Sequence, residues 1–469
     1  MLNKTVSSLT VAIALAAAIA SSAAVAQRDS ASRLAELRDR IARLDADTTR
    51  VEDITQIQRL QRAFGYYLDK GYFGEAADLF ADDGRVQYGV DGVYVGRERI
   101  RELFTRHGHG SMTAGPGLPF GRINMHMQLQ PMITVADDGR TAKGRWREWA
   151  LLGEYQVAIF WGDAVLENDY VKQDGVWKIG EMRFYTNFVA PYKGGWAALD
   201  PVDGDWKTEI GAEFPADEPS PVSYRPFPAV YVPPYHFERD RSAIESSIPP
   251  ATRARPDDAL GRLEAMADME AQKLARVSSL RAIENLQAMY GYYVDKGKWH
   301  EAASLFSEDG SWEFGQSGVY IGRESVERGL SLMGPEGLQP GQLNNYPMLQ
   351  PIITVAADNR TAKGRWRSDV MLSNDGKGRW GGGVYENEYV NDNGTWKISK
   401  QHYWVTFWAD YDIGFSARGA IPMDPPSTSN PPDAPPTVEY ESFPNTYIVP
   451  FHFDHPVTGK PHKYLDGGQ

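Results

Sequence analysis

Short segments with charged side chains occur twice in this chain and carry groups suited to chemistry. GYYLDKG places a carboxylate, Asp69, at the end of an aromatic segment, and GYYVDKG does the same with Asp295. The segment GRWR, which also occurs twice, contains Arg145 and Arg147 in its first copy. Alternate residues of a strand point to the same face, so these arginines either grip a carboxylate ligand or pair with an acid of the next strand. Glu167 and, in the second copy, Glu386 are the candidates for that pairing.

Several other kinds of catalytic chemistry have no support in the sequence. The chain has no cysteine, which excludes a thiolate nucleophile, disulfides and cysteine-ligated metals. His107 and His109 form an HGH in a glycine-rich segment that we interpret as a loop, without an HExxH or a third ligand nearby. We therefore expect no metal site. No phosphate-binding or dinucleotide fingerprint stands in a strand-turn-helix setting, so no cofactor is expected.

The chain is an internal duplication with a period of roughly 220 residues, which indicates two domains and not a solenoid. The repeated pairs are GYYLDKG and GYYVDKG, GVYVGRE and GVYIGRE, LQPMITVADDGRTAKGRWR and LQPIITVAADNRTAKGRWR, GVWKIGE and GTWKISK, and FPAVYVPPYHF and FPNTYIVPFHF. Proline-rich segments close each copy with extended chain. The expected parts are a signal peptide (1–26), an amphipathic helix (27–50), domain 1 (51–195), a tail and linker (196–258), a helix with domain 2 (259–410) and a C-terminal tail (411–469).

Each copy is expected to begin with helices and continue with strands. Leucine and isoleucine recur at helical spacing between Leu34 and Leu44, and the aromatic helix that follows has Gly71 as its stop. A short helix, EAADLFADDG, comes next. The period then changes to two in VQYGVDGVYVG, in the strands around DGR and in those around DGVW. This order predicts an α+β cone, a curved antiparallel sheet wrapped around helices with a pocket between them.

The order of these motifs resembles the SnoaL-like branch of the nuclear transport factor 2-like superfamily, in both copies, over about residues 50–190 and 280–410. The resemblance implies a cone with a deep apolar pocket. It is a family of polyketide cyclases, dehydratases, isomerases, cofactor-free lyases and non-catalytic binders, so it implies the fold more strongly than the reaction.

The resemblance also implies site residues. Asp69 matches the pocket aspartate at the end of the first helix, Tyr88 resembles the pocket tyrosine, and His126 falls where many members have a histidine before the central strand. We expect Asp69 as the base, His126 as its acid–base partner and Tyr88 as the hydrogen-bond donor to a carbonyl or oxyanion. Structural roles for all three remain open. The further expected pocket residues are Tyr67, Trp146, Tyr293, Asp295, Tyr346 and His402.

The two copies differ at these positions. Copy two has Phe314 in place of Tyr88 and Tyr346 in place of His126, while it keeps Asp295. We therefore expect copy one to hold the active or tighter-binding pocket. The expected function is that of a lyase, dehydratase or isomerase for a small aromatic or polycyclic molecule. The alternatives are a small-molecule carrier and an envelope interaction module.

Charge and the N-terminus indicate the compartment and the partners. The net charge of −13 and the lack of a basic run make nucleic acid an unlikely partner. Lys4, a short apolar run and Ala24-Val25-Ala26 predict a cleaved signal peptide, and the apolar run is too short to span a bilayer. We expect a periplasmic or secreted protein without a membrane span. We also expect the two domains to pair within one chain as a pseudo-dimer.

Overall fold

The structure is a computed structural model and describes residues 3–109, 117–199, 209–237, 260–374, 376–415 and 420–463. The chain divides into two compact units. One consists of residues 1–51 and 245–275, and the other contains both sheets, residues 52–244 and 276–469.

The first unit contains the beginnings of two long helices. Helix α1 spans Asn3–Asp69 and helix α5 spans Leu260–Asp295, so the predicted signal segment is helical here from Asn3 onward. Within this unit Lys273 Nζ lies 2.6 Å from Asp45 Oδ1, and Thr48 donates to Glu270 at 2.5 Å. Among the described residues no helix is both long and apolar enough to cross a membrane.

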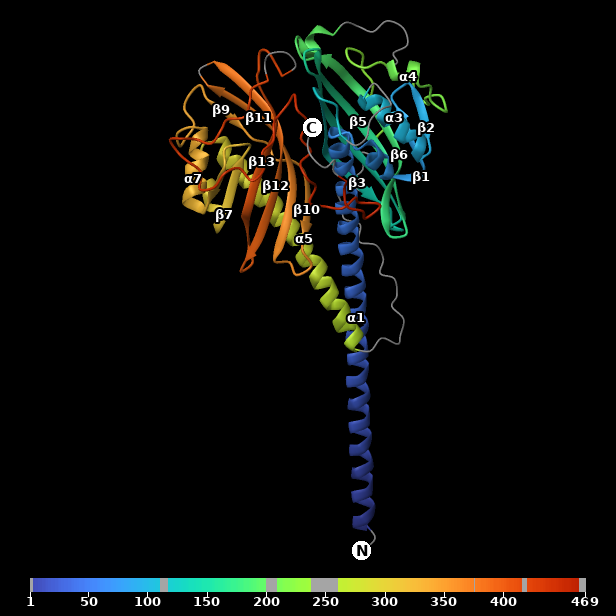
Figure 1. Cartoon of the computed structure of the whole chain (residues 1–469). Helices are drawn as coiled ribbons and strands as arrows, with labels where there is room; N and C mark the ends of the chain where they lie inside the picture. Colours follow the sequence, from blue (N-terminus) through green and yellow to red (C-terminus); the bar gives the residue numbers. More distant parts are fainter. Residues whose placement is uncertain are drawn as a thin grey trace. The chain divides into compact units, whose positions relative to one another are not determined.

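Domain 1 follows α1 with a six-stranded sheet (Figure 1). Its elements are α2 (Phe73–Asp78), β1 (Phe80–Tyr88), β2 (Gly92–Val95), α3 (Arg97–His109), β3 (Arg122–Val135), β4 (Thr141–Glu154), β5 (Ala158–Gln173) and β6 (Val176–Pro191). The strand order is β2-β1-β6-β5-β4-β3, and only the β1–β6 pair is parallel among these neighbours. The short helices η1 (Gly195–Ala198) and α4 (Glu209–Glu213) follow.

Domain 2 repeats this arrangement after α5. Its elements are α6 (Trp299–Ser304), β7 (Phe306–Phe314), β8 (Val319–Ile321), α7 (Arg323–Leu330), η3 (Ser331–Met333), β9 (Leu343–Asn345), β10 (Leu349–Val355), β11 (Thr361–Asn374), β12 (Lys377–Asp392) and β13 (Thr395–Asp410). The order is β10-β11-β12-β13-β7-β8, with β9 beside β11 and β7 parallel to β13. The expected pair of tandem α+β cones is confirmed.

The end of α1 sits against strand β3, and two glycines make this possible. Gly71 has φ +72°, a conformation that favours glycine, and it ends the helix as predicted. A Cβ at Gly65 would lie 2.3 Å from the carbonyl oxygen of His126, so only glycine allows helix and strand to approach this closely. This contact fixes the position of β3 along the helix.

Two local expectations are corrected by the structure. The HGH segment is not a loop, because His107 and His109 end helix α3. That helix is supported by ion pairs at helical spacing, among them Arg99–Glu102 and Arg106–Glu102. The short helix after Gly71 ends at Asp78, because Phe80 already begins strand β1.

The arginine–glutamate pairing expected between neighbouring strands is confirmed in both domains. Arg145 pairs with Glu167 directly across the β4–β5 ladder, and Arg365 pairs with Glu386 in the same way. A tail histidine completes each cluster. His236 Nδ1 lies 2.9 Å from Glu167, and His452 Nδ1 lies 2.8 Å from Glu386.

Candidate functional site

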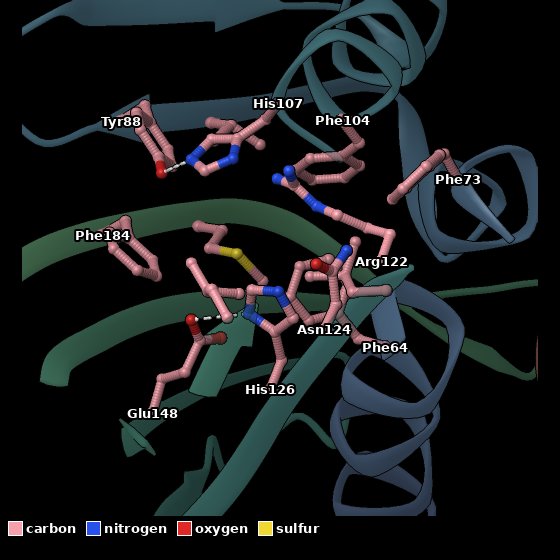
Figure 2. A pocket seen from close by; sticks show the side chains of 14 residues that line it. Phe64, Phe73, Tyr88, Phe104, His107, Arg122, Asn124, His126, Glu148 and Phe184 are labelled. Atoms are coloured by element: carbon pink, nitrogen blue, oxygen red, sulfur yellow. Dashed lines mark hydrogen bonds and ion pairs between the residues drawn. The ribbon is translucent and has the colours of Figure 1, made fainter. Parts of the chain in front are cut away.

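Domain 1 contains a cavity of about 100 Å³ between its helices and the sheet. Most of the wall is apolar, and the polar groups come from β1, α3, β3 and β4 (Figure 2). The lining residues are Phe64, Leu68, Phe73, Val86, Tyr88, Phe104, His107, Arg122, Asn124, His126, Glu148, Leu152, Met182 and Phe184. An apolar chamber with a few convergent polar groups is typical of a small-molecule site.

His126 and Glu148 form a polar pair on one side of this cavity. His126 Nδ1 lies 3.1 Å from Glu148 Oε1, and the Glu148 side chain is only 4% exposed. The ladder explains the contact, because Gln128 of β3 is directly opposite Glu148 of β4 and His126 lies two residues along on the same face. With Nδ1 protonated toward the carboxylate, Nε2 keeps its lone pair and can accept a proton.

A buried hydrogen-bond network holds Glu148 from behind. Gln128 Nε2 donates to Glu148 Oε2 at 2.6 Å, and Gln61 Nε2 donates to Gln128 Oε1 at 2.8 Å. Gln61 in turn accepts from Asn168 and Tyr170, each at 2.9 Å. Hydrogen-bond networks of this kind rigidify the groups they hold, so the position of Glu148 is set by strands β3, β4 and β5 and by helix α1.

Among the described residues, the corresponding network of domain 2 does not reach a carboxylate. Asn387 and Tyr389 bond to Gln287 there, as their counterparts bond to Gln61. Gln287 then donates to Gln401 and to the sulfur of Met348. The shared half of the network therefore belongs to the fold, whereas its extension to Glu148 and His126 is particular to domain 1.

Tyr88 and His107 form a second polar pair, opposite the first in Figure 2. The hydroxyl of Tyr88 contacts Nε2 of His107. Burial lowers the pKa of His107 to about 4, with the neighbouring His126 adding to the effect. Burial also raises the pKa of Tyr88 well above its ordinary value of 10, and the Glu148 charge acts in the same direction. Near neutral pH the pair is therefore an uncharged imidazole and an intact phenol.

Two further polar groups line the cavity. Arg122 lies at the start of β3, and Figure 2 shows its guanidinium directed toward Phe104 and His107. Arg122 Nη1 lies 3.3 Å from Glu154 Oε2, and the Glu154 side chain is half exposed, so this ion pair is weak. Asn124 is 4% exposed, and its Oδ1 has no hydrogen-bond partner among the described residues. A buried acceptor without a donor is costly, so a bound molecule that donates a hydrogen bond is favoured here.

Domain 2 has replaced every one of the paired polar groups. Phe314, Met333, Tyr346 and Ser368 stand where domain 1 has Tyr88, His107, His126 and Glu148. The interior is also filled, because Trp312 replaces Val86 and Tyr385 replaces Leu166, and both are almost completely buried. Trp312 Nε1 donates to the Tyr290 hydroxyl at 3.0 Å, so these larger rings are locked in place.

A more open pocket of about 470 Å³ lies at the mouth of domain 2. It is lined by Trp299, Met333, Asn344 and Leu372, together with Lys377 and Arg379. No histidine or carboxylate is among its lining residues. Lys377 is the titratable side chain in this lining, and no histidine or carboxylate accompanies it as an acid–base partner.

The structure brings together two of the three residues expected to be catalytic. His126 and Tyr88 line the cavity of domain 1, whereas Asp69 does not. Its carboxylate accepts the backbone N–H of His126 at 2.5 Å and forms an ion pair with Arg367 of domain 2. Both ionic side chains are nearly inaccessible to solvent, 2% and 3% exposed. The helix end that carries Asp69 thus faces the second domain, which the single-domain resemblance could not indicate.

The other expected pocket residues lie outside the lining of the domain 1 cavity. Tyr67 is buried under the C-terminal tail and its hydroxyl lies 2.7 Å from His462 Nε2. Trp146 donates to Tyr170 at 2.9 Å. In domain 2, Asp295 accepts the Tyr346 N–H at 2.6 Å, Tyr346 donates to Met333, and His402 is buried beside Glu313, while Tyr293 is half-buried.

Four polar cavity residues were not expected to line the pocket from the sequence: Glu148, His107, Arg122 and Asn124. Glu148 follows the second GRWR arginine and breaks the repeat, because domain 2 has Ser368 there. The sequence singled out His107 only as part of HGH. The helix α3, which directs its side chain toward Tyr88, was not predicted there. Arg122 precedes the repeated segment. The sequence signal that could have identified the first three of these residues is therefore the difference between two otherwise similar copies. Among the described residues no cluster of three or more histidines and acids is placed to hold a metal.

A comparison with protein families agrees with two tandem domains. The model of the SnoaL-like domain matches residues 49–183 and 275–402. No significant match was found among curated proteins. Similar solved structures include a putative scytalone dehydratase from Novosphingobium aromaticivorans (20% identity, 34% of this chain and 98% of that chain, TM-score 0.27). A second similar structure is that of a hexachlorocyclohexane dehydrochlorinase, type 2 (20% identity, 33% of this chain and 95% of that chain, TM-score 0.27).

A further similar structure is that of an NTF2-like protein with a cystatin-like fold from N. aromaticivorans (19% identity, 32% of this chain and 91% of that chain, TM-score 0.25). Each of these structures corresponds in length to about one of the two domains.

Proposed function

Because the chain belongs to the SnoaL-like family, we propose that domain 1 acts on a small apolar molecule by cofactor-independent acid–base chemistry, as a lyase, dehydratase or isomerase. The observation that carries the proposal is the arrangement of two polar pairs, His126–Glu148 and Tyr88–His107, around one apolar cavity. Domain 2 has kept the fold and replaced all four residues.

His126 is the proton acceptor in this proposal. Its Nδ1 bonds to Glu148, which leaves Nε2 available to remove a proton from a substrate carbon or hydroxyl. The carboxylate then stabilises the imidazolium that forms, and the network through Gln128 keeps the carboxylate in place. The proton returns from Nε2 to the leaving group or to a second carbon, so no external acceptor is needed.

Tyr88 is the electrophilic partner. Its high pKa keeps the phenol protonated, so it can donate a hydrogen bond to a carbonyl oxygen or a developing oxyanion. His107 contacts that phenol and remains uncharged near neutral pH because its pKa is about 4. Asp69, the base expected from sequence, instead holds the backbone of His126 and the second domain in this account.

The cavity favours a particular kind of substrate. Its aromatic and aliphatic wall suits a ring system, Asn124 offers an unused acceptor to a hydroxyl, and Arg122 offers a positive charge to an anionic or strongly polar end. We therefore propose a small cyclic molecule with at least one hydroxyl and one acidic or carbonyl group as the substrate class.

Domain 2 serves as a scaffold in this proposal. The buried Trp312 and Tyr385 fill its interior and stabilise it. Its Arg367 anchors the helix end of domain 1, so the two domains form a pair within one chain.

We also propose that the chain is exported after cleavage before Gln27. N-terminal sequencing of the protein recovered from its native host tests this, because a chain beginning at Met1 in the cytoplasm would contradict it.

The functional proposal is tested by ligand-induced thermal stabilisation against a library of cyclic hydroxy acids, ketones and their neutral analogues. Val86→Trp copies into domain 1 the residue that fills domain 2, and it is expected to abolish stabilisation by every true cavity ligand. Leu372→Trp at the mouth of domain 2 is the matched control and should leave stabilisation unchanged.

The outcomes separate the alternatives. Ligands that are lost with Val86→Trp and are turned over by the wild type support the enzyme. Ligands that are lost in the same variant without any turnover by the wild type support a carrier. Ligands that are lost only with Leu372→Trp would contradict the assignment of the site to domain 1.

A further inference from the structure

Strand β3 begins with a turn, residues 119–122, that ends at the arginine of the domain 1 cavity. The N–H of Arg122 donates to the carbonyl of Pro119 at 3.1 Å, so the charged side chain starts from the turn itself. Gly121, at the corner, has φ +80°. A Cβ there would lie 2.9 Å from the Cβ of Tyr155, so the turn packs closely on the hairpin between β4 and β5.

The C-terminal tail of domain 2 holds this turn through residues 443–446, which we call the tail clamp. The N–H of Gly121 donates to the carbonyl of Pro444 at 2.8 Å. The hydroxyl of Thr446 donates to the carbonyl of Leu118 at 3.1 Å. One hydrogen bond is thus made at the corner of the turn and one just before it, so domain 2 fixes the backbone that leads to Arg122.

The tail occurs in both copies, but its two phenylalanines have different surroundings. Phe227 donates its N–H to Asn187 and its counterpart Phe443 donates to Thr406, each at 2.7 Å, so both tails leave their domains in the same way. The ring of Phe443 is 4% exposed and meets the ring of Tyr155, with centroids 5.9 Å apart. The ring of Phe227 is 44% exposed.

The corresponding turn of domain 2, residues 339–342, is neither clamped nor charged. Its glycine, Gly341, has φ +87°, but no atom of the described residues lies within 4 Å of a Cβ built there. Gln342 stands in the place of Arg122. The clamp and the arginine therefore occur together, in the domain whose cavity carries the two polar pairs.

The guanidinium of Arg122 has few partners of its own. Its Nε is buried without a hydrogen-bond partner among the described residues, and its ion pair with Glu154 is weak. Figure 2 shows that the group nevertheless reaches toward Phe104 and His107. A long side chain with so few bonds has many rotamers available. The place of its charge therefore depends on the turn from which it starts.

We propose that the tail clamp of domain 2 positions Arg122 and thereby gives the domain 1 cavity its preference for anionic ligands. The inference rests on the proposed function, because it concerns recognition in the same cavity. The clamp residues are positioning residues, since they contact the turn and are not among the residues that line the cavity. Domain 2 then takes part in ligand selection in addition to its role as a scaffold.

The test compares the affinities of hydroxybenzoates with those of the matching hydroxybenzamides by isothermal titration. These probes are small rings with a hydroxyl group and differ in the charge that Arg122 would recognise. Thr446→Val and Phe443→Ala should each lower the acid-to-amide affinity ratio by about threefold or more, because each loosens the turn while the cavity wall stays intact. Thr446→Ser keeps the hydroxyl and should keep the ratio. Phe227→Ala, in the other tail, is the matched control.

Hydrogen exchange of residues 118–122, followed by mass spectrometry, tests the clamp without a ligand. Both clamp variants should exchange this segment faster than the wild type, because the Gly121 N–H loses its fixed acceptor. Exchange as slow as in the wild type overturns the proposal.

The two measurements separate the inference from the proposed function. A ratio that Arg122→Met lowers, and that both clamp variants leave unchanged, overturns the inference while the proposed substrate class stands. A wild type that binds neither member of any pair, or binds both equally, contradicts the charge recognition proposed for the cavity and this inference with it.

Discussion

The carboxylate of Asp69 in domain 1 forms a buried ion pair with the guanidinium of Arg367 in domain 2, and its other oxygen accepts the backbone N–H of His126. One residue thereby ties the second domain to the strand that carries a cavity histidine. The two copies are not equivalent in this respect, because Asp295 accepts the matching N–H of Tyr346 without an ion-pair partner among the described residues.

Asp69→Asn is expected to lower the free energy of unfolding by about 3–5 kcal/mol, because it leaves a buried guanidinium unpaired. Chemical denaturation followed by tryptophan fluorescence measures this. The double variant Asp69→Asn with Arg367→Met should recover part of the loss, since the unpaired guanidinium is then removed. Asp295→Asn is the matched control and should cost less. Equal losses at both positions would contradict the role of the ion pair.

Trp312→Ala is expected to lower the free energy of unfolding by about 3–5 kcal/mol, because Trp312 fills the interior of domain 2 and a cavity would remain. Val86→Ala, at the matching position of domain 1, removes fewer atoms beside an existing cavity and should cost less. Urea denaturation of both variants provides the comparison. A smaller loss for Trp312→Ala than for Val86→Ala would show that domain 2 is not filled as described.

The sequence alone predicts the fold and part of the candidate site. The repeats predicted two cones, and period-two segments located the strands, because these signals depend on short-range chemistry. His126 and Tyr88 were found because each copy carries the fold's motifs around them. Asp69 was assigned to the pocket because a single-domain pattern contains no information about a second domain that supplies Arg367. Glu148 was missed because its partner His126 is 22 residues away, and only the β3–β4 register shows that the two side chains lie on the same face, two residues apart along the ladder.

The pH dependence of stability should reflect His107. Its pKa of about 4 lies below the ordinary value of 6.5, so between these values the unfolded chain binds more protons than the folded chain. Its contribution is therefore fully present above pH 6.5 and is lost as the pH falls toward 4. Unfolding measured at about pH 7 and about pH 5 should show a smaller loss in His107→Gln than in the wild type.

The exposed His300 offers a control of opposite sign for this measurement. Its hydrogen bond to Glu327 raises its pKa above 6.5, so its contribution is present at low pH and is lost as the pH rises. His300→Gln should therefore not reduce the loss of stability at low pH. An unchanged pH dependence in His107→Gln would contradict an uncharged, buried imidazole at position 107.

Arg122→Met should weaken binding of acidic cavity ligands by about tenfold or more while leaving neutral analogues nearly unaffected, because only the acid interacts with the guanidinium charge. Isothermal titration with matched acid and amide pairs from the ligand library measures the difference. Arg140→Met, in an exposed turn, is the control for net charge. Equal losses for acid and amide would show that Arg122 shapes the cavity without recognising charge.

The central claim is that the His126–Glu148 pair of domain 1 performs the proton transfer. The most direct measurement is the steady-state turnover of a cavity ligand by the wild type, His126→Gln, Glu148→Gln and the domain 2 counterpart variant Tyr346→Phe. The account predicts that kcat falls by about 10²–10⁴-fold in His126→Gln and also falls in Glu148→Gln, with ligand binding retained and Tyr346→Phe unchanged. Full turnover by His126→Gln, or a loss confined to Tyr346→Phe, would contradict it.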